Sequence, residues 1–157
     1  MKTKHLRRVD IWPQTGWRMN ERTVRRLVRT MLNANRRRPN YHLDLYWVDG
    51  ESIRKLGRRY FSARRLTDVI SLTYSSGPGF LQGEIYICVP VAEKQAKTYG
   101  VSLQAEVLRL IAHGVLHLLG HDDGSEDQRQ RMHRLENRAL AQLNIKTLDN
   151  KAQKPLI

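Results

Sequence analysis

The sequence predicts a single α+β domain in which a mixed four-stranded sheet is packed with about five helices. The chain has 157 residues, a length that suits one domain. It is 40% hydrophobic and 27% charged, as is typical of globular proteins. The hydrophobic periodicity changes in the order strand, helix, strand, helix, strand, strand and three helices. We expect the domain to cover residues 1–143, and residues 144–157, which show no period, to form a loose tail.

The first half of the chain predicts two strands and two helices. An edge strand is expected over residues 5–12, before Pro13. A helix capped by Asn20 should run to about residue 36, since its apolar residues recur at helical spacing. Strict alternation over residues 42–47 predicts a half-buried strand. Asp49-Gly50 then indicates a turn before a short helix over about residues 51–60.

The second half predicts two more strands and three helices. The strands are expected over residues 68–74 and 83–89, and a helix should run from Pro90 to about residue 99. The most apolar helix, about residues 103–119, has apolar residues on most of its circumference, which predicts burial on most sides. A final helix is expected to begin after Ser125, which forms a capping-box pattern with a glutamine three positions later.

The net charge predicts an anionic partner. The chain carries 28 Lys and Arg against 15 Asp and Glu, a formal charge of +13, and arginine grips phosphate bidentately. Residues 1–40 alone hold 12 basic and 2 acidic side chains. We expect the basic first helix and the loop over residues 58–65 to contact a nucleic-acid backbone. Trp12 and Trp17 are candidates for stacking on unpaired bases, whereas Trp47 is expected in the core.

Several classes of protein are disfavoured by what the sequence lacks. The one cysteine, Cys88, has no partner for an internal disulfide, so nothing indicates an oxidising compartment. The first residues lead into no apolar segment of the kind found in secretory signals. No uncharged apolar run approaches the roughly 18 residues of a membrane span. A cytoplasmic location without membrane association is therefore expected.

A cluster of histidines in the most apolar helix predicts a metal site. His113 and His117 are four residues apart and therefore neighbours on one helical face, where both can reach one zinc ion. Gly120 favours a turn that ends the helix. Asp123 can then return a carboxylate to the same ion, with His121 as the rival third ligand. Catalytic zinc sites typically take three protein ligands and leave one position open.

The two-histidine helix is zincin-like, but one residue argues against peptidase activity. Zinc peptidases of the H-E-x-x-H type place a glutamate base directly after the first histidine. Gly114 stands at that position and cannot move a proton. Asp122 is a candidate to accept a ring N–H from one of the histidines.

Together these segments resemble the YbeY family of bacterial metal-dependent endoribonucleases, which act in ribosomal RNA maturation. The family signature is H-G-x-L-H-L-x-G-Y-D-H, and residues 113–123 read HGVLHLLGHDD. Residues 67–72, TDVISL, are similar to the family's T-D-V-L-S-F, and residues 83–87, GEIYI, to its G-D-I-x-I. The resemblance spans about residues 43–136. It implies one α+β domain, one zinc ion held by three ligands, and action on RNA in the context of the ribosome.

The sequence departs from the family pattern at two functional positions. Asp123 stands where the family has its third histidine, and a carboxylate ligand makes the metal a weaker Lewis acid. Phe61 stands where the family has an arginine suited to neutralising phosphate. Arg59 is our candidate catalytic substitute, with Arg64 as an alternative.

Three functions are open on these observations. The first is a single-strand-specific, zinc-dependent endoribonuclease of ribosomal RNA processing, which the resemblance extends to 16S 3′-end maturation, ribosome quality control and a small-subunit partner. The metal ligands would be His113, His117 and Asp123. The second is a non-catalytic RNA- or ribosome-binding module with a structural metal. The third, a metallohydrolase of a small or peptide substrate, is the weakest because it gives the basic first quarter of the chain no purpose.

Overall fold

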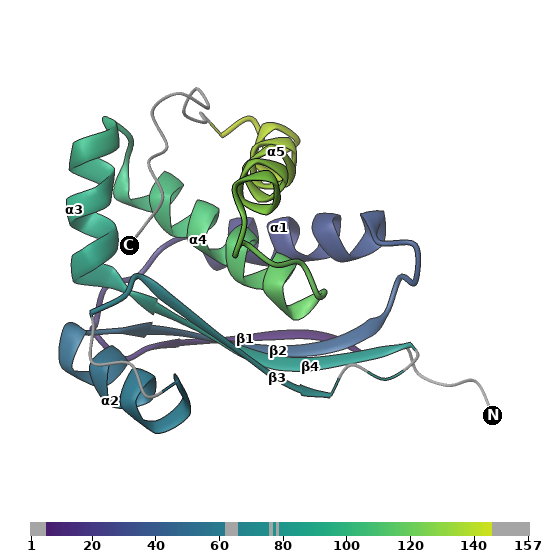
Figure 1. Ribbon diagram of the computed structural model, residues 1–157, viewed down its shortest axis with the longest axis horizontal. Helices are drawn as coiled ribbons and strands as arrows, with labels where there is room; N and C mark the ends of the chain where they lie inside the picture. Colours follow the sequence, from purple (N-terminus) through teal and green to yellow (C-terminus); the bar gives the residue numbers. More distant parts are fainter. Residues whose placement is uncertain (1–5, 62–65, 76, 78, 146–157) are drawn as a thin grey trace.

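A mixed four-stranded sheet forms the centre of the computed structural model, which describes residues 6–61, 66–75, 77 and 79–145 (Figure 1). The spatial order of the strands is β1-β2-β4-β3. The strands β1, β2 and β4 run parallel, and β3 is antiparallel to β4. Their bounds are Arg7–Pro13 for β1, Asn40–Val48 for β2, Val69–Ser75 for β3 and Phe80–Cys88 for β4.

Five helices complete the described fold, and four of them lie on one side of the sheet (Figure 1). That side carries α1, α4 and α5 over the strands and α3 at the end of the sheet, whereas α2 covers the opposite face. The predicted single α+β domain is therefore confirmed. The bounds are Glu21–Ala34 for α1, Gly50–Phe61 for α2, Val89–Tyr99 for α3, Leu103–Leu118 for α4 and Glu126–Ala141 for α5.

The helix ends follow the predicted capping chemistry. The Asn20 side chain accepts hydrogen bonds from two backbone N–H groups of α1, and the Ser102 hydroxyl accepts one from the backbone of α4. Ser125 and Gln128 form the complete capping box of α5. One expectation was wrong in detail: Asp49-Gly50 is not a separate turn. The Asp49 carboxylate accepts the N–H of Ser52 at 2.8 Å, so α2 begins directly at Gly50.

Each face of the sheet has its own apolar core. The larger core lies between the sheet and helices α1, α4 and α5, and contains the fully buried Trp47. The apolar side chains of α1 that enter it are the predicted stripe, namely Val24, Leu27, Val28, Met31 and Leu32. A smaller core lies under α2 and consists of Val48, Ile53, Ile70 and Cys88 with partly buried neighbours. The arginines of α1 point outward, and the exposed ones within the helix are Arg22, Arg25, Arg26 and Arg29.

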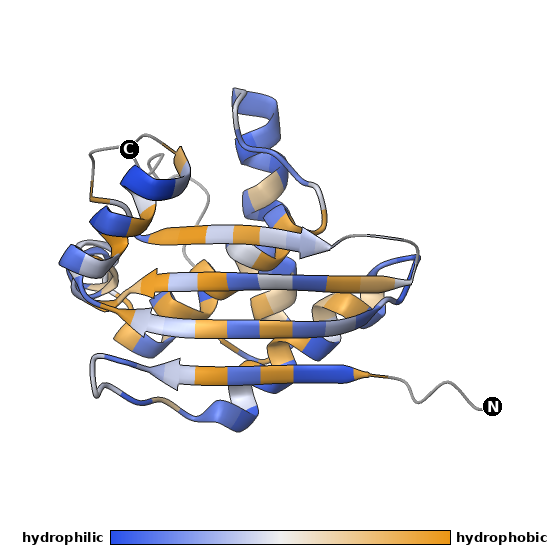
Figure 2. Cartoon of the chain, turned by 90° about the horizontal axis from the view of Figure 1, so that it is seen from below, coloured by the Kyte–Doolittle hydropathy of each residue, from blue (hydrophilic) through white to orange (hydrophobic). Residues whose placement is uncertain are grey.

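Much of the second sheet face is open to solvent. Figure 2 views the molecule from this side, where α2 covers only one end of the strands. Along β2, residues at odd positions are buried in the larger core and residues at even positions lie on the second face, where only the last of them, Val48, is buried under α2. Trp12, which is 49% exposed, stacks against Tyr46 there, and Tyr46 stacks against Tyr86.

The end of the described chain packs against the domain. The Ile145 side chain contacts the larger core, and its N–H donates to the carbonyl of Leu140. Residues 146–157 lie outside the described part, so the predicted boundary at residue 143 and the loose tail stay predictions. None of the helices in the described ranges is both long enough and apolar enough to cross a bilayer.

Helix α4 packs tightly against the sheet at Gly114, which predicts a stability cost for any side chain there. A Cβ atom at this position would lie 2.9 Å from the Ile85 side chain and 3.0 Å from Ser71 Oγ. We expect Gly114→Ala to lower the free energy of unfolding by about 1–3 kcal/mol in urea titrations. Gly124→Ala is the matched control, because a Cβ there meets its nearest neighbour at an ordinary 3.6 Å. Equal stability of the two variants would contradict the close approach.

Candidate metal centre

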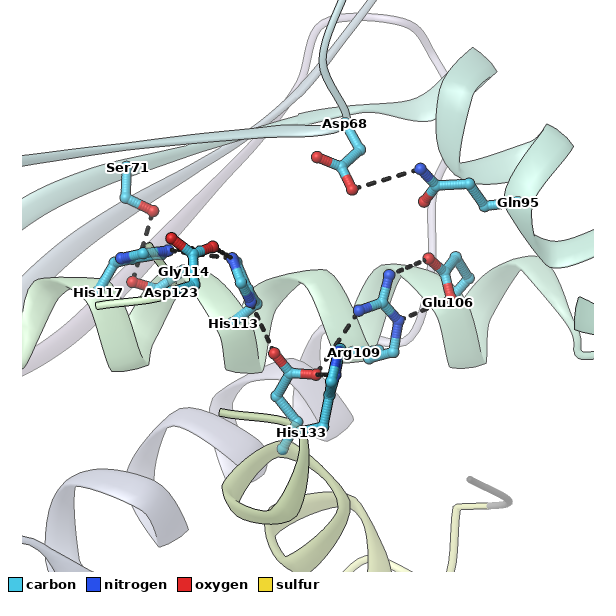
Figure 3. Close-up of polar contacts among 11 residues, drawn as sticks. Asp68, Ser71, Gln95, Glu106, Arg109, His113, Gly114, His117, Asp123 and His133 are labelled. Atoms are coloured by element: carbon cyan, nitrogen blue, oxygen red, sulfur yellow. Dashed lines mark hydrogen bonds and ion pairs between the residues drawn. The ribbon is translucent and has the colours of Figure 1, made fainter. Parts of the chain in front are cut away.

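Three side chains converge beside the C-terminal half of α4 (Figure 3). The Nε2 atoms of His113 and His117 are 3.0 Å apart. The Oδ2 atom of Asp123 lies 3.4 Å from each of these nitrogens. Sequence analysis predicted these three residues as ligands, and the structure brings them together.

The separations fit a small metal ion. Bonds of about 2.0–2.1 Å in a tetrahedral zinc site place the ligand atoms about 3.3 Å from one another. The observed values of 3.0, 3.4 and 3.4 Å match that spacing. Two imidazole nitrogens and one carboxylate oxygen are also a donor set that suits zinc. The site is half-buried, with the Asp123 side chain 45% exposed, so a substrate can approach it from solvent.

The turn after α4 returns Asp123 to the helix. Gly120 adopts a positive φ of 94°, which ends the helix, and the N–H of the next residue donates to the carbonyl of Leu116. Arg129 of α5 then donates to the Asp123 carbonyl oxygen at 3.4 Å. His121, the rival ligand, is not part of the converging group.

Glu136, a buried carboxylate that the sequence analysis missed, accepts a hydrogen bond from the first histidine, His113. The Nδ1–H of His113 donates to Oε1 of Glu136 at 2.6 Å, and Glu136 is fully buried. His133 contacts the other oxygen of Glu136 at 3.3 Å. This contact orients the His113 ring so that Nε2 faces the other two ligands, a task for which Asp122 was the sequence-based candidate.

An ion-pair network continues from Glu136 along α4 (Figure 3). Arg109 lies 3.6 Å from Glu136 and makes two hydrogen bonds to Glu106, at 2.6 and 3.0 Å. All three side chains are buried. One signal could have identified Glu136 in the sequence: it lies four residues after Met132, on the inward face of the last helix.

The charges of the site shift each other's pKa. Hydrogen bonding from His113 holds the pKa of Asp123 at about 2. Burial lowers the pKa of His113, but its contacts with Asp123 and Glu136 outweigh burial and raise the pKa to about 9. Burial raises the pKa of Glu136, but contacts with His113 and His133 outweigh it and lower the pKa to about 2. Without metal, the site therefore holds a protonated His113 between two carboxylates.

This arrangement predicts how the stability of the metal-free protein depends on pH. The pKa of His113 is about 9 in the folded protein against an ordinary 6.5. Its contribution to stability is therefore fully present below pH 6.5 and is lost as the pH rises through 9. Urea unfolding in the presence of a chelator should detect this loss. Asp123→Asn should shift the loss to lower pH, because it removes one carboxylate that raises the His113 pKa. Stability that stays flat over this range in the unmodified chain would contradict the assigned contacts.

Further polar side chains line the sheet beside the site. Ser71 of β3 donates to the Gly114 carbonyl at 3.4 Å. Asp68, which is buried, accepts from Gln95 of α3 at 3.3 Å. Both Asp68 and Ser71 belong to the T-D-V-I-S-L segment noted in the sequence, and they connect β3 with the surrounding helices.

The arginine candidates are placed apart from the converging residues. Arg59 and Phe61 lie at the end of α2, which covers the opposite face of the sheet from α4 (Figure 1). The Arg59 guanidinium lies over the ring of Tyr60, 5.3 Å from its centroid, and Phe61 is 55% exposed. Arg64 lies outside the described residues.

A mixed sheet covered by a helix that carries two converging histidines, with a carboxylate facing them, is typical of metal-dependent hydrolases. The comparisons with known proteins are specific about the family. Residues 13–144 match the family described as Endoribonuclease YbeY. The chain belongs to this family.

Curated relatives agree with that assignment, and a solved structure shares the fold. The endoribonuclease YbeY of Thermobifida fusca is 35% identical over 143 residues, covering 85% of this chain and 92% of that protein. The Desulforamulus reducens protein of the same name is 36% identical over 130 residues, covering 78% and 85%. The solution structure of TM1509 from Thermotoga maritima matches with a TM-score of 0.54 at 20% identity, covering 87% of this chain and 91% of that one. That structure supports the fold.

Proposed function

We propose that this protein is a single-strand-specific, zinc-dependent endoribonuclease that acts on ribosomal RNA. The observation that carries the proposal is the convergence of His113, His117 and Asp123 at separations that suit one zinc ion. Three protein ligands leave a coordination position for water or substrate. Membership of the endoribonuclease YbeY family supports RNA as the substrate.

The residues around the proposed zinc site have different roles. A zinc ion held there would supply Lewis-acid chemistry toward a phosphodiester. Glu136 fixes the ring of His113, so that its Nε2 stays aimed at the ion. Asp123 completes the ligand set, and its carboxylate would lower the net positive charge of the metal site. The partial exposure of Asp123 leaves room for an RNA phosphate.

RNA binding is assigned to the basic surface of the protein. The exposed arginines of α1 form a positive surface suited to RNA phosphates, whose binding weakens as salt rises. Arg59 is the sequence-based candidate to replace the family arginine, but it lies at the end of α2, on the opposite face of the sheet from the α4 site. Its proposed role is therefore contact with the backbone of a bound RNA strand, away from the phosphate at the metal, for which its exposed position is suited.

The proposed setting is the cytoplasm, with the small ribosomal subunit as partner. The expected tasks there are 16S 3′-end maturation and ribosome quality control. The proposal carries this setting over from the family resemblance, and the strongly basic composition supports a partner made largely of RNA.

A second candidate function is a non-catalytic RNA- or ribosome-binding module with a structural metal. Two residues favour it: Asp123 replaces a histidine of the family pattern, and Phe61 replaces the arginine. Such a module would bind RNA after chelation of the metal and would cleave nothing.

The two functions are separated by a cleavage assay on a single-stranded ribosomal RNA fragment. The purified protein is tested as isolated, after chelation, and after zinc is restored. Cleavage that disappears with the metal and returns with zinc is the expected result. Salt-sensitive binding without cleavage in all three samples would favour the second function. A duplex of the same sequence serves as the control for strand specificity and should remain uncut.

A further inference from the structure

The open face of the sheet carries a second group of potential metal ligands. Asp10 of β1 with His42 and Asp44 of β2 place one ligand atom each within 4.8 Å of one another. The His42 Nε2 atom lies 3.0 Å from Oδ2 of Asp10 and 3.7 Å from Oδ2 of Asp44. Among the described residues, only this group and the α4 group have such an arrangement.

The position of these residues is fixed by strand pairing. Asp10 and Asp44 are direct partners in the parallel register of β1 and β2, and His42 precedes Asp44 by two residues on the same face. The residues that flank them, Val9 and Leu43, are buried in the larger core on the other face. The two potential metal sites therefore lie on opposite faces of the sheet.

Two carboxylates in directly opposite positions repel each other and destabilise a strand pair. The side chains of Asp10, His42 and Asp44 are only 24%, 27% and 23% exposed, so water screens this repulsion incompletely. Burial raises the pKa of Asp10, but hydrogen bonds from His42 and Arg8 outweigh burial and lower it. A cation held between the strands would relieve the repulsion.

Asp10 and Asp44 each direct one carboxylate oxygen toward His42, and Arg8 and Trp12 contact these two carboxylates. The Trp12 indole N–H donates to Oδ1 of Asp44 at 2.9 Å, which leaves Oδ2 facing the histidine. Arg8 contacts the Oδ2 atom of Asp10 at 2.7 Å, but its side chain is 60% exposed, and ion pairs to such exposed side chains contribute little free energy. The Trp12 contact resembles the outer hydrogen bonds that orient metal-ligating carboxylates.

We propose that Asp10, His42 and Asp44 form a second metal site, which binds a divalent first-row transition ion such as zinc and ties the edge strand β1 to β2. One imidazole and two carboxylates match the donors that zinc takes in proteins. The observed separations of 3.0 and 3.7 Å bracket the roughly 3.3 Å between ligand atoms of a tetrahedral ion. Arg8 competes with the ion for Asp10, so this site binds more weakly than the α4 site.

The experiment counts zinc ions on a protein whose α4 site has been removed. Equilibrium dialysis of the His117→Ala chain against zinc, read by elemental analysis, should give one bound ion. Adding Asp10→Asn or His42→Gln should weaken this binding at least about tenfold, since each removes one of three ligands. Adding Arg8→Gln should strengthen it severalfold because the competing cation is gone. Glu93→Gln, which removes an exposed carboxylate on α3, is the matched control and should change nothing.

The thermal midpoint gives an independent readout of the same site. Zinc should raise the midpoint of the His117→Ala chain and of its Arg8→Gln derivative, and should leave that of the Asp10→Asn derivative unchanged. Far-UV circular dichroism checks that each variant is folded, and Asp10→Asn and His42→Gln serve as independent tests if one fails. Zinc binding that survives both substitutions, or that Arg8→Gln weakens, would overturn the proposal, as would no bound ion on the folded His117→Ala chain.

Discussion

Replacing His117 with alanine is expected to remove the metal of the α4 site and to abolish RNA cleavage. The imidazole of His117 lies 3.0 Å from His113 and 3.4 Å from Asp123, and within the described part of the chain no further His, Cys, Asp or Glu joins this group. Two remaining ligands hold zinc poorly. The loss should exceed the roughly 10–100-fold that follows removal of an outer hydrogen-bond partner of a metal ligand. Cleavage of the single-stranded RNA and the zinc content are measured on the same preparation.

His121→Ala is the matched control for this experiment. His121 lies four residues further along the chain and is not part of the converging group. It should keep both zinc and cleavage. The ligand assignment would fail if His117→Ala cleaved RNA with unchanged metal content, or if His121→Ala lost the metal. A cleaving His117→Ala preparation must also be free of contaminating nuclease, which a mock purification tests.

Replacing Glu136 is expected to have the largest effect on stability. Glu136 is fully buried and faces Arg109, His113 and His133. Glu136→Ala leaves these groups without their carboxylate, and breaking a buried ion pair in this way costs about 3–5 kcal/mol of the free energy of unfolding. Urea titration measures the loss. Glu93→Ala, which removes an exposed carboxylate that lies 3.8 Å from Lys97, should cost less than about 1 kcal/mol.

Glu136→Gln distinguishes the effect of Glu136 on stability from its effect on zinc binding. Glu136→Gln keeps the shape of the side chain, so the variant should remain folded at moderate temperature. Its amide orients the His113 ring less strongly than a carboxylate does, and zinc affinity should fall about 10–100-fold. Unchanged zinc affinity in a folded Glu136→Gln protein would show that Glu136 supports only the fold.

Much of the secondary structure could be predicted from the sequence because its signals are local. Helix α1 combines a capping asparagine with an apolar stripe at helical spacing, and both signals lie within a few residues of each other. The candidate ligands could also be predicted from local signals. His113 and His117 share one helical face, and Gly120 readily adopts the positive φ that ends the helix.

The features that the sequence analysis missed depend on contacts between distant segments. Glu136 reaches His113 across 23 positions of the chain, and only the packing of α5 against α4 brings them together. Asp10 and Asp44 become neighbours through a parallel strand register that no local pattern reveals. The periodicity of α2 likewise predicts a helix but does not say which face of the sheet the helix covers, so the position of Arg59 could not be predicted.

The candidate ligands of the α4 site come from segments of unequal rigidity, and this has a consequence for the rate of metal exchange. His113 and His117 belong to a helix that is buried along most of its length, whereas Asp123 lies in the short irregular segment that follows Gly120. Segments with few buried contacts open far more often than core helices do. Departure of an ion should therefore begin with release of the Asp123 carboxylate. The motion of this segment would set the lifetime of the bound ion. The two histidines would stay in place, so that half of the coordination shell is preformed when an ion binds again.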